Sequence, residues 1–391
     1  MKWKFYSLAF VAGMSILTAC SSDDNNDNDG NGGNGNGNEI ENGTILKGTI
    51  TSDVTLAAGN TYKLSGEYIV EEGATLHIEE GVKIIAVYDD IADYILVKQG
   101  GKINAVGTPD KPIVMTSEKE EPGAWGGIHI CGRAHTNAEG GKGSSEIGGA
   151  VYGGNDDADN SGTLQYIRLE YTGFAFDEEH EANGISFYGV GNGTIVDHCQ
   201  AYKGSDDGFE FFGGSVNVSN LVAVSCSDDS FDWTEGWNGK GTNLVAYQEA
   251  ESTLGYDCDC LIEADNNEND NAASPISHPT LKNLILAGNG ESKQGIRLRR
   301  GTQVHIDNAK VCGKGQPLAI ESTLTNSALK NGTSLLANMT ISAELTTDGD
   351  YTNADFIAAT GNKVDAALSY ASFDAIKAEC DWMNGCLLYT S

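Results

Sequence analysis

Two short stretches of this 391-residue sequence carry the same acidic motif. The segments GSDDGFEFFGG (204–214) and CSDDSFDWTEG (226–236) place Ser-Asp-Asp ahead of a phenylalanine, an acid and an aromatic residue, 22 positions apart. If the chain repeats at that period, the carboxylates of the two copies meet, and calcium accepts several carboxylate oxygens at flexible geometry. We therefore predict a calcium ion held by Asp206 and Asp228, with Asp207 or Asp229 as a further ligand. The alternative is that all four side chains are turn formers that point into water.

The residues that follow each Asp pair set a register. When NGISFYG (183–189), DGFEFFG (207–213), DSFDWTE (229–235) and QGIRLRR (294–300) are aligned, large apolar residues alternate with other positions, as expected for strands with one buried side. The inward residues are Ile185, Phe209, Phe231 and Ile296, with Phe187, Phe211, Trp233 and Leu298 one pleat further on. The positions between them, Ser186, Glu210, Asp232 and Arg297, share an outward surface with adjacent copies roughly 5 Å apart.

Three aromatic residues make this outward surface a candidate ligand site. Tyr188 and Phe212 fall on the outward pleat, and Trp237 follows the second motif. Exposed aromatic rings on a flat sheet can stack on sugar rings. We therefore predict a glycan or other extracellular ligand bound by Tyr188, Glu210, Phe212, Asp232, Trp237 and Arg297. Lateral loops that covered the surface would remove this function.

The same surface offers an enzymatic alternative, a calcium-assisted polysaccharide lyase. Such an enzyme needs a cation to neutralise a uronate carboxylate and a lysine or arginine as base, for which Lys293, Arg297 and Arg299 are the candidates. An inverting hydrolase fits less well, because a repeat places like carboxyl groups in a row and not on opposite sides of a bond. A third possibility is a structural surface protein, in which Arg297 only pairs with Glu210 or Asp232.

A column of turn residues predicts the architecture that positions these side chains. Segments such as IVDHCQAYKG, NVSNLVAVSC and TLKNLILAGN superpose so that one position recurs at intervals of 32, 22, 23, 40, 25 and 30 residues. The column contains Tyr166, His198, Asn220, Asn243, Asn283, Asn308 and Asn338. A minimum near 22 residues with variable additions is typical of a solenoid. Asparagine suits the tight turn before each strand, and its stacked side chains can hydrogen-bond along the column.

Short apolar runs separated by Gly, Asn and Asp make the chain all-β. We expect the segments 133–162 and 249–279 to leave the coil as long lateral loops, and FDAIKAECDWM (373–383) to form a short helix that caps its open end. The second loop holds Cys258 and Cys260, whose spacing does not suggest zinc. The eight cysteines after Cys20 stay unassigned between disulfides and buried thiols.

The chain ends predict segments outside the coil. Two lysines and a short apolar run ending in LTAC predict a signal peptide over residues 1–19 and a lipid anchor on Cys20. A disordered Gly/Asn/Asp tether follows over 20–43, and the β-helix domain spans 44–385. The last residues, CLLYTS (386–391), can be back-translated to a sequencing-adaptor end, so we predict that they do not belong to the natural protein.

The charge of the chain limits its partners. The sequence carries 24 Lys and Arg against 56 Asp and Glu, a net charge of −32. Because phosphate binding needs a basic surface, nucleic acid is excluded as a partner. We expect a monomer that contacts the membrane only through its lipid anchor.

Several motifs resemble a known group of proteins. GATLHIEEGVKI, GTPDKPIVMTS, GAWGGIHICG and GIRLRRGT, with the Asp repeat, are similar to Bacteroidetes surface lipoproteins that have the right-handed parallel β-helix of the pectin-lyase-like superfamily. The resemblance runs from about Thr44 to Trp382 and implies this fold and an outer-membrane, cell-surface location. It implies no activity, because this group has none established. Polygalacturonase-like members pair acidic motifs with Gly-His-Gly and Arg-Ile-Lys, whereas this sequence has GIRLRR and no Gly-His-Gly.

Overall fold

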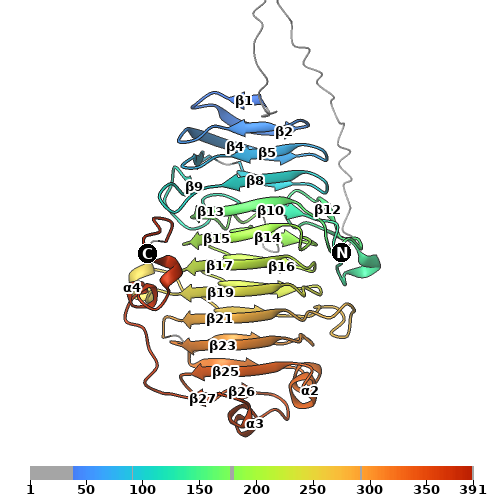
Figure 1. Ribbon diagram of the computed structural model, residues 1–391, viewed down its shortest axis with the longest axis vertical. Helices are drawn as coiled ribbons and strands as arrows, with labels where there is room; N and C mark the ends of the chain where they lie inside the picture. Colours follow the sequence, from blue (N-terminus) through green and yellow to red (C-terminus); the bar gives the residue numbers. More distant parts are fainter. Residues whose placement is uncertain (1–37, 90, 177–179, 291–292, 390–391) are drawn as a thin grey trace, which may run out of the picture. The chain divides into compact units, whose positions relative to one another are not determined.

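The computed structural model describes residues 38–89, 91–176, 180–290 and 293–389, so the predicted signal peptide, Cys20 and most of the tether lie outside the described residues. Within this part of the chain, 25 strands are linked by parallel pairing into one sheet that winds as a coil (Figure 1). This is the all-β parallel β-helix that the sequence predicts, and parallel strands joined by crossovers favour its right hand. Residues 38–40 already pair with residues 54–56, so the coil begins before residue 44.

Each turn of the coil adds strands to three walls, which we call A, B and C. Wall A begins with the short strands β1 (Asn38–Ile40), β3 (Val54–Leu56), β5 (Thr75–Ile78) and β8 (Lys102–Val106), and wall B has β6 (Lys83–Ala86), β9 (Ile113–Ser117) and β27 (Lys363–Val364). Longer strands run through the corner from wall A into wall B: β13 (Gly162–Glu170), β15 (Ile195–Tyr202), β17 (Asn217–Val224), β19 (Lys240–Tyr247), β21 (Thr280–Ala287), β23 (His305–Cys312) and β25 (Leu335–Ile341).

Wall C is the wall that carries the Asp-motif strands. It contains β2 (Ile45–Ile50) and β4 (Thr61–Val70), which both start in wall B, followed by β7 (Tyr94–Val97), β10 (Ile128–Cys131), β14 (Ile185–Tyr188), β16 (Phe209–Phe212), β18 (Phe231–Thr234), β20 (Ile262–Ala264), β22 (Gln294–Leu298), β24 (Gln316–Ile320) and β26 (Thr346–Thr347). The motifs around residues 207 and 229 therefore enter neighbouring strands of one wall, as predicted.

The remaining elements lie outside the walls. The first insertion holds η1 (Glu139–Gly141) and the antiparallel pair β11 (Gly143–Ser144) and β12 (Val151–Tyr152), and the others are α1 (Glu251–Leu254), α2 (Thr323–Asn331), α3 (Asn353–Ala358), α4 (Phe373–Lys377) and η2 (Asp381–Met383). None of the helices in the described residues is both long and apolar enough to cross a membrane.

The predicted C-terminal helix is confirmed as α4, but it does not cap the coil. α4 lies beside the coil (Figure 1). Its residues Phe373 and Ile376 belong to one hydrophobic cluster with Val222 and Val245, on the outer side of wall B. The end of the coil is instead covered by α3, which contacts β27 and buries Phe356 in the main core. The amphipathic pattern thus correctly predicted a helix with one buried side. It did not indicate which part of the coil that side packs against.

Aromatic rings stack on the inner side of wall C, in the core of the coil. Phe209 and Phe231 lie in register, with ring centroids 5.6 Å apart and planes inclined by 13°. Phe187 and Phe211 stack in the same way at 5.0 Å and 10°. All eight residues predicted to point inward are buried in the main core, so the register read from the motifs is confirmed.

The asparagine column forms the corner between walls A and B. All seven of its residues have a positive φ, between 52° and 63°, which bends each long strand at its middle and not before its start as predicted. Asn243 donates to Asn220 at 2.8 Å, Asn283 to Asn243 at 3.0 Å and Asn308 to Asn283 at 2.9 Å, each from Nδ2 to Oδ1. Asparagine fits here because it tolerates the left-handed backbone and its amide bonds to the next amide.

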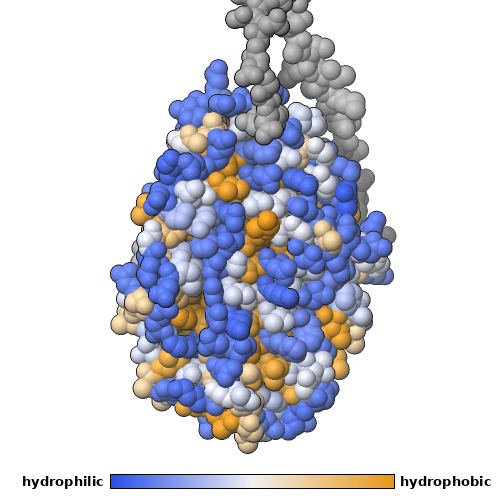
Figure 2. Space-filling model, viewed as in Figure 1, coloured by the Kyte–Doolittle hydropathy of each residue, from blue (hydrophilic) through white to orange (hydrophobic). Residues whose placement is uncertain are grey.

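The surface seen in Figure 2 is mostly hydrophilic, with hydrophobic residues in small separate groups. Large apolar patches usually mark protein or membrane contacts. This view shows none, so the features of the surface that could bind a ligand are polar ones.

Replacing Phe209 by Ala is expected to lower the free energy of unfolding by about 3 to 5 kcal/mol, because the change opens a cavity in the aromatic stack. Glu210→Ala, on the same strand but pointing outward, is expected to cost less than about 1 kcal/mol in EDTA. Urea unfolding of both variants measures the difference. Equal losses would mean that the register is shifted by one residue.

Candidate functional site

The second aspartate of each motif is buried and ties one turn of the coil to the next. Asp207 Oδ1 accepts a hydrogen bond from the backbone N–H of Asp229 at 2.8 Å, and Asp229 Oδ1 accepts one from the N–H of Cys260 at 2.7 Å. Asp207 is 5% exposed and Asp229 4% exposed. The prediction that these side chains point into water is therefore wrong for Asp207 and Asp229, although Asp228 is exposed.

The predicted row of outward residues on wall C, Ser186, Glu210, Asp232 and Arg297, is confirmed with one correction. Glu210 lies beside Asp232, as predicted, but Asp232 then pairs with Glu263 of β20, and Glu263 pairs with Arg297. The segment 249–279 was expected to leave the coil as a loop, whereas its residues 262–264 form a strand of wall C. Asp232 and Arg297 are therefore one turn further apart than the alignment implied.

An open cleft of about 390 Å³ lies where the Asp motifs enter wall C. Its lining among the described residues is entirely acidic: Glu146, Glu181, Asp206, Asp207, Glu210, Asp228 and Asp232. We call it the acidic cleft. Two sets of three carboxylates each place oxygens within 4.8 Å of one another, namely Asp206 with Asp207 and Asp228, and Asp207 with Glu210 and Asp232. Asp207 is common to both sets, so three of the four predicted calcium ligands lie in one site with the predicted glycan ligands Glu210 and Asp232. The fourth, Asp229, does not line this cleft.

The protein satisfies Asp232 and Glu210 to different degrees. Oδ1 of Asp232 is buried without a hydrogen-bond partner. Glu210 accepts a hydrogen bond from Nδ2 of Asn183 at 2.5 Å, and that amide nitrogen also donates to Ser186 Oγ at 3.0 Å. A buried carboxylate oxygen without a donor is costly, which makes it a candidate ligand for a cation.

Burial and mutual repulsion raise the pKa values of the acids in the cleft. The pKa of Asp206 rises to about 8, first through burial and then through the charges of Asp228 and Glu181. Burial, followed by the charge of Asp229, holds the pKa of Asp207 well above its usual range, and burial, followed by the charge of Glu146, does the same for Glu210. At neutral pH the cleft must therefore bind protons or another cation to relieve this repulsion.

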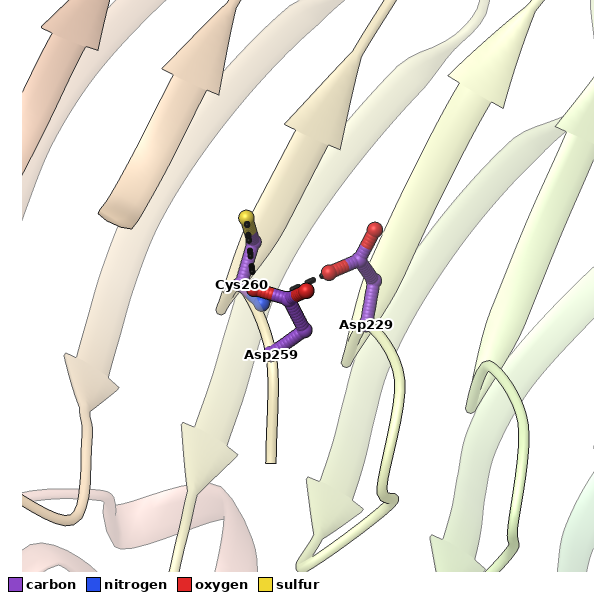
Figure 3. A group of neighbouring side chains, drawn as sticks. All are labelled: Asp229, Asp259 and Cys260. Carbon is purple, nitrogen blue, oxygen red and sulfur yellow. Dashed lines mark hydrogen bonds between the residues drawn. The ribbon is translucent and has the colours of Figure 1, made fainter. Parts of the chain in front are cut away.

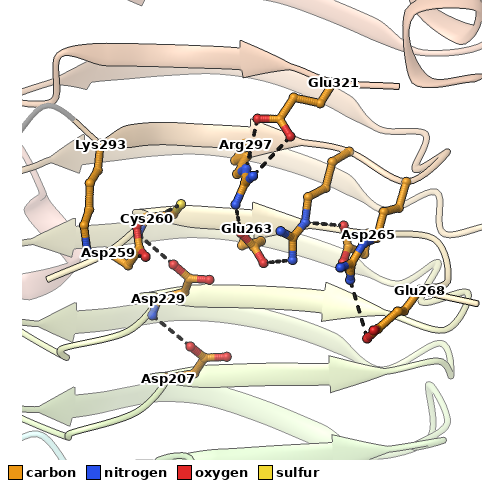
Figure 4. Close-up of polar contacts among 12 residues, drawn as sticks. Asp207, Asp229, Asp259, Cys260, Glu263, Asp265, Glu268, Lys293, Arg297 and Glu321 are labelled. Carbon is orange, nitrogen blue, oxygen red and sulfur yellow. Dashed lines mark hydrogen bonds and ion pairs between the residues drawn. The ribbon is translucent and has the colours of Figure 1, made fainter. Parts of the chain in front are cut away.

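The three predicted bases are all held in ion pairs. Figure 4 shows those of Arg297 with Glu263 and Glu321. Arg297 lies between Glu263 at 3.0 Å and Glu321 at 3.0 Å. Arg299 pairs with Glu263 and, at 2.8 Å, with Asp265. Burial lowers the pKa of Arg297, but its hydrogen bonds and charges with Glu321 and Glu263 outweigh burial and raise it overall.

Lys293 is paired in the same way, with Asp257 at 2.9 Å and Asp259 at 3.4 Å. Its pKa is raised, because the two aspartates outweigh the lowering effect of burial. None of the three cations is thus prepared to remove a proton from a substrate. The predicted pairing of Arg297 with Glu210 or Asp232 is also wrong, since its partners are Glu263 and Glu321.

The predicted aromatic platform does not exist in the described residues. Tyr188 is 0% and Phe212 8% exposed, because the first insertion lays Ile147 and Tyr152 over them. Trp237 is 1% exposed and stacks on Phe211 in the main core, with ring centroids 4.1 Å apart. The outward pleat was assigned correctly for Tyr188 and Phe212, but an outward position on a β-helix is not exposed when a loop covers the wall.

A second acidic group lies at the next turn of the coil. Figure 3 shows Asp229 and Asp259 beside Cys260, whose N–H and thiol contact one carboxylate each. Burial, followed by the charge of Asp229, raises the pKa of the Cys260 thiol, so it stays protonated and is a poor metal ligand. All eight cysteines of the described residues are buried and unpaired, which agrees with buried thiols.

Two residues of the cleft were missed at the level of sequence. Glu146 reaches the cleft from the first insertion, where Oε2 accepts a hydrogen bond from Tyr188 at 3.2 Å. No sequence pattern locates a residue of such a loop. Glu181 comes two residues before Asn183, and Asn183 aligns with Asp207. The alignment of the motifs therefore indicates that Glu181 lies near the Asp motifs, at the start of wall C.

Comparison with known proteins agrees with this architecture. The profile of the family described as pectate-lyase-like β-helix domain matches residues 48–386, which is most of the chain. No curated protein and no solved structure gave a significant match. With its three walls of parallel strands and a family match along nearly all of the coil, the chain belongs to the pectate-lyase-like β-helix domain family.

Proposed function

We propose that this protein binds calcium in the acidic cleft and that the loaded cleft holds an acidic extracellular glycan. The observation that carries the proposal is the lining of the cleft, in which all seven of the described residues are acidic. Calcium takes six to eight oxygen ligands and accepts carboxylates of varied geometry. Asp207, Glu210 and Asp232 supply three such groups close together, and Oδ1 of Asp232 has no hydrogen-bond partner that a cation would have to displace.

An acidic glycan follows from the charge of the site and from the family. Without a cation, seven carboxyl groups repel a uronate, and the buried aromatic residues offer no platform for a neutral sugar ring here. A calcium ion bound at the bottom of an open cleft retains coordination positions for a ligand carboxylate. The pectate-lyase-like family supports a carbohydrate as that ligand. Binding is therefore mediated by the cation and not by direct contact with the protein alone.

A calcium-assisted lyase at the same site is the second candidate. The charges of Lys293 and Arg299 act on Asp228, so two of the predicted bases lie beside the cleft. Their ion pairs keep both side chains protonated, which supports binding over catalysis. A structural protein without a ligand is the outcome if neither calcium nor a glycan binds.

The predicted lipid anchor would place the cleft outside the cell. Residues 1–37 lie outside the described residues, so the anchor on Cys20 and the location at the outer-membrane surface are part of the proposal. Extracellular calcium modules work at dissociation constants of about 10⁻⁴ to 10⁻³ M, an affinity that a partly open cleft can provide. Membrane fractionation of a Cys20→Ser variant tests the anchor, and an unchanged membrane fraction would contradict it.

Calcium is expected to bind the EDTA-treated protein and to raise its melting temperature, because it binds the folded state alone. Titration calorimetry and thermal melts measure both effects. Asp232→Asn, which removes one ligand charge with little change in shape, is expected to weaken calcium binding about tenfold or more. Asp350→Asn makes the same charge change at an exposed site and is expected to have no effect. Absence of calcium heat in the unmodified protein would leave the Asp motifs as structural.

Polygalacturonate is expected to bind in calcium and to dissociate when EDTA is added. Asp232→Asn is expected to lose this binding in proportion to its loss of calcium, while Asp350→Asn keeps it. Ultraviolet absorbance of the same mixtures reports unsaturated uronate products, which the binding proposal predicts to be absent. An absorbance rise that requires calcium would support the lyase, and a lack of binding in saturating calcium would contradict the glycan proposal.

A further inference from the structure

A second groove lies on a different part of the coil, where walls A and B meet. The C-terminal segment folds back along wall B and leaves a groove of about 490 Å³ between itself and the asparagine column. Asn243, Asn283 and Asn308 line one side, and Trp382 lines the other together with Glu379. We call this the amide groove. Its volume falls within the range of about 300 to 1,000 Å³ that is usual for small-ligand sites.

The asparagine side chains present a fixed row of hydrogen-bonding groups to this groove. Asn243 and Asn283 each use one N–H and one lone pair in the ladder described above, and Asn308, at the end of the ladder, uses one N–H. A primary amide has two N–H donors and two acceptor lone pairs. One donor and one acceptor per residue are therefore available to a ligand, and they repeat at the spacing of about 4.8 Å between turns of the coil.

Trp382 gives the groove an aromatic surface. The indole is half-buried and makes an edge contact with the ring of His198, at 6.2 Å between ring centroids and an angle of 79° between the planes. A ring fixed in this way costs little conformational entropy when a ligand stacks on it. Aromatic faces opposite rows of neutral donors and acceptors match the two sides of a sugar ring, its C–H face and its hydroxyl edge.

The charges of the groove argue for a neutral ligand. Lys310 is paired with Glu379, which also accepts a hydrogen bond from Tyr370 at 3.2 Å. Asp381 adds a negative charge at the rim. Lys310, the one cation that lines the groove in the described part of the chain, is thus neutralised. A chain of net charge −32 also repels phosphates and uronates.

We propose that the amide groove binds a neutral oligosaccharide without a metal ion. The site uses different residues, a different corner of the coil and different ligand chemistry from the acidic cleft, so it does not rest on the proposed function. The asparagines have a structural role as turn formers in any case. The proposal is that their outer hydrogen-bonding groups, with Trp382, are also a recognition surface.

The test is a titration in EDTA with neutral tetrasaccharides of glucose, xylose and mannose, followed by tryptophan fluorescence and calorimetry. Trp125, Trp233 and Trp237 are buried, so the fluorescence change is expected to come from Trp382 and to disappear in Trp382→Phe. Asn308→Asp keeps a residue that tolerates the left-handed backbone but removes both N–H donors of the amide, the outward one and the one bonded to Asn283, and it is expected to weaken binding at least tenfold. Asn238→Asp, at an exposed position between walls C and A, is the matched control and is expected to bind normally.

Asp232→Asn distinguishes this site from the acidic cleft, because it is expected to weaken calcium binding and to leave the neutral sugar unaffected. Melting temperatures of all variants show whether each is folded. Binding that needs calcium, binding that survives both Trp382→Phe and Asn308→Asp, or no binding of any member of the panel at millimolar concentration would each overturn the proposal.

Discussion

Neighbouring turns of this coil lie about 4.8 Å apart, and that spacing decides how every column of like residues behaves. Apolar rings gain from it, since Phe187 and Phe211 stack at 5.0 Å inside the coil. Amides gain as well, because Asn243, Asn283 and Asn308 of the corner column each donate to the asparagine before them. Carboxylates do not gain, because like charges at this distance raise one another's pKa values.

The structure relieves that repulsion differently along wall C. At the later turns, Arg297 and Arg299 neutralise Glu263, Asp265 and Glu321. At the earlier turns, Asp207 and Asp229 are partly satisfied by backbone N–H groups, but no lysine or arginine lines the acidic cleft among the described residues. The unbalanced charge is therefore concentrated where the two Asp motifs meet, which is why a divalent cation is the simplest partner for this site.

Structural features that repeat once per turn of the coil could be predicted from the sequence. The Phe209 and Phe231 stack, the Glu210 and Asp232 neighbours and the positive φ of Asn220 all repeat at the length of one turn, so an alignment finds them. Residues outside the period could not be located in this way. The sequence did not reveal that Ile147 covers Tyr188, that Glu146 enters the cleft, or that residues 262–264 return to the wall, because loops are positioned by tertiary packing and not by a local pattern.

The same limit explains the error about aromatic residues. Trp237 is an aromatic residue of the kind that binds sugars, but it packs on Phe211 in the core. Trp382 lines the amide groove, although its sequence predicts only a capping helix. An aromatic residue is exposed or buried according to what packs over it. For this fold, the side chains of a wall can be assigned to its inner or outer side from the sequence, but coverage of the outer side requires the structure.

The central claim is that a cation relieves the repulsion in the acidic cleft, and thermal unfolding as a function of pH tests it most directly. The folded-state pKa of Asp206 is raised from 3.8 to about 8, so the stability that its protonation provides is complete below about pH 4 and is lost as pH rises through about 8. In EDTA, the melting temperature is therefore expected to be lower at pH 8 than at pH 5. Calcium is expected to raise it at pH 8 much more than at pH 5, with sodium chloride of equal ionic strength as the control. A calcium effect no larger than that of sodium chloride at pH 8 would contradict the account.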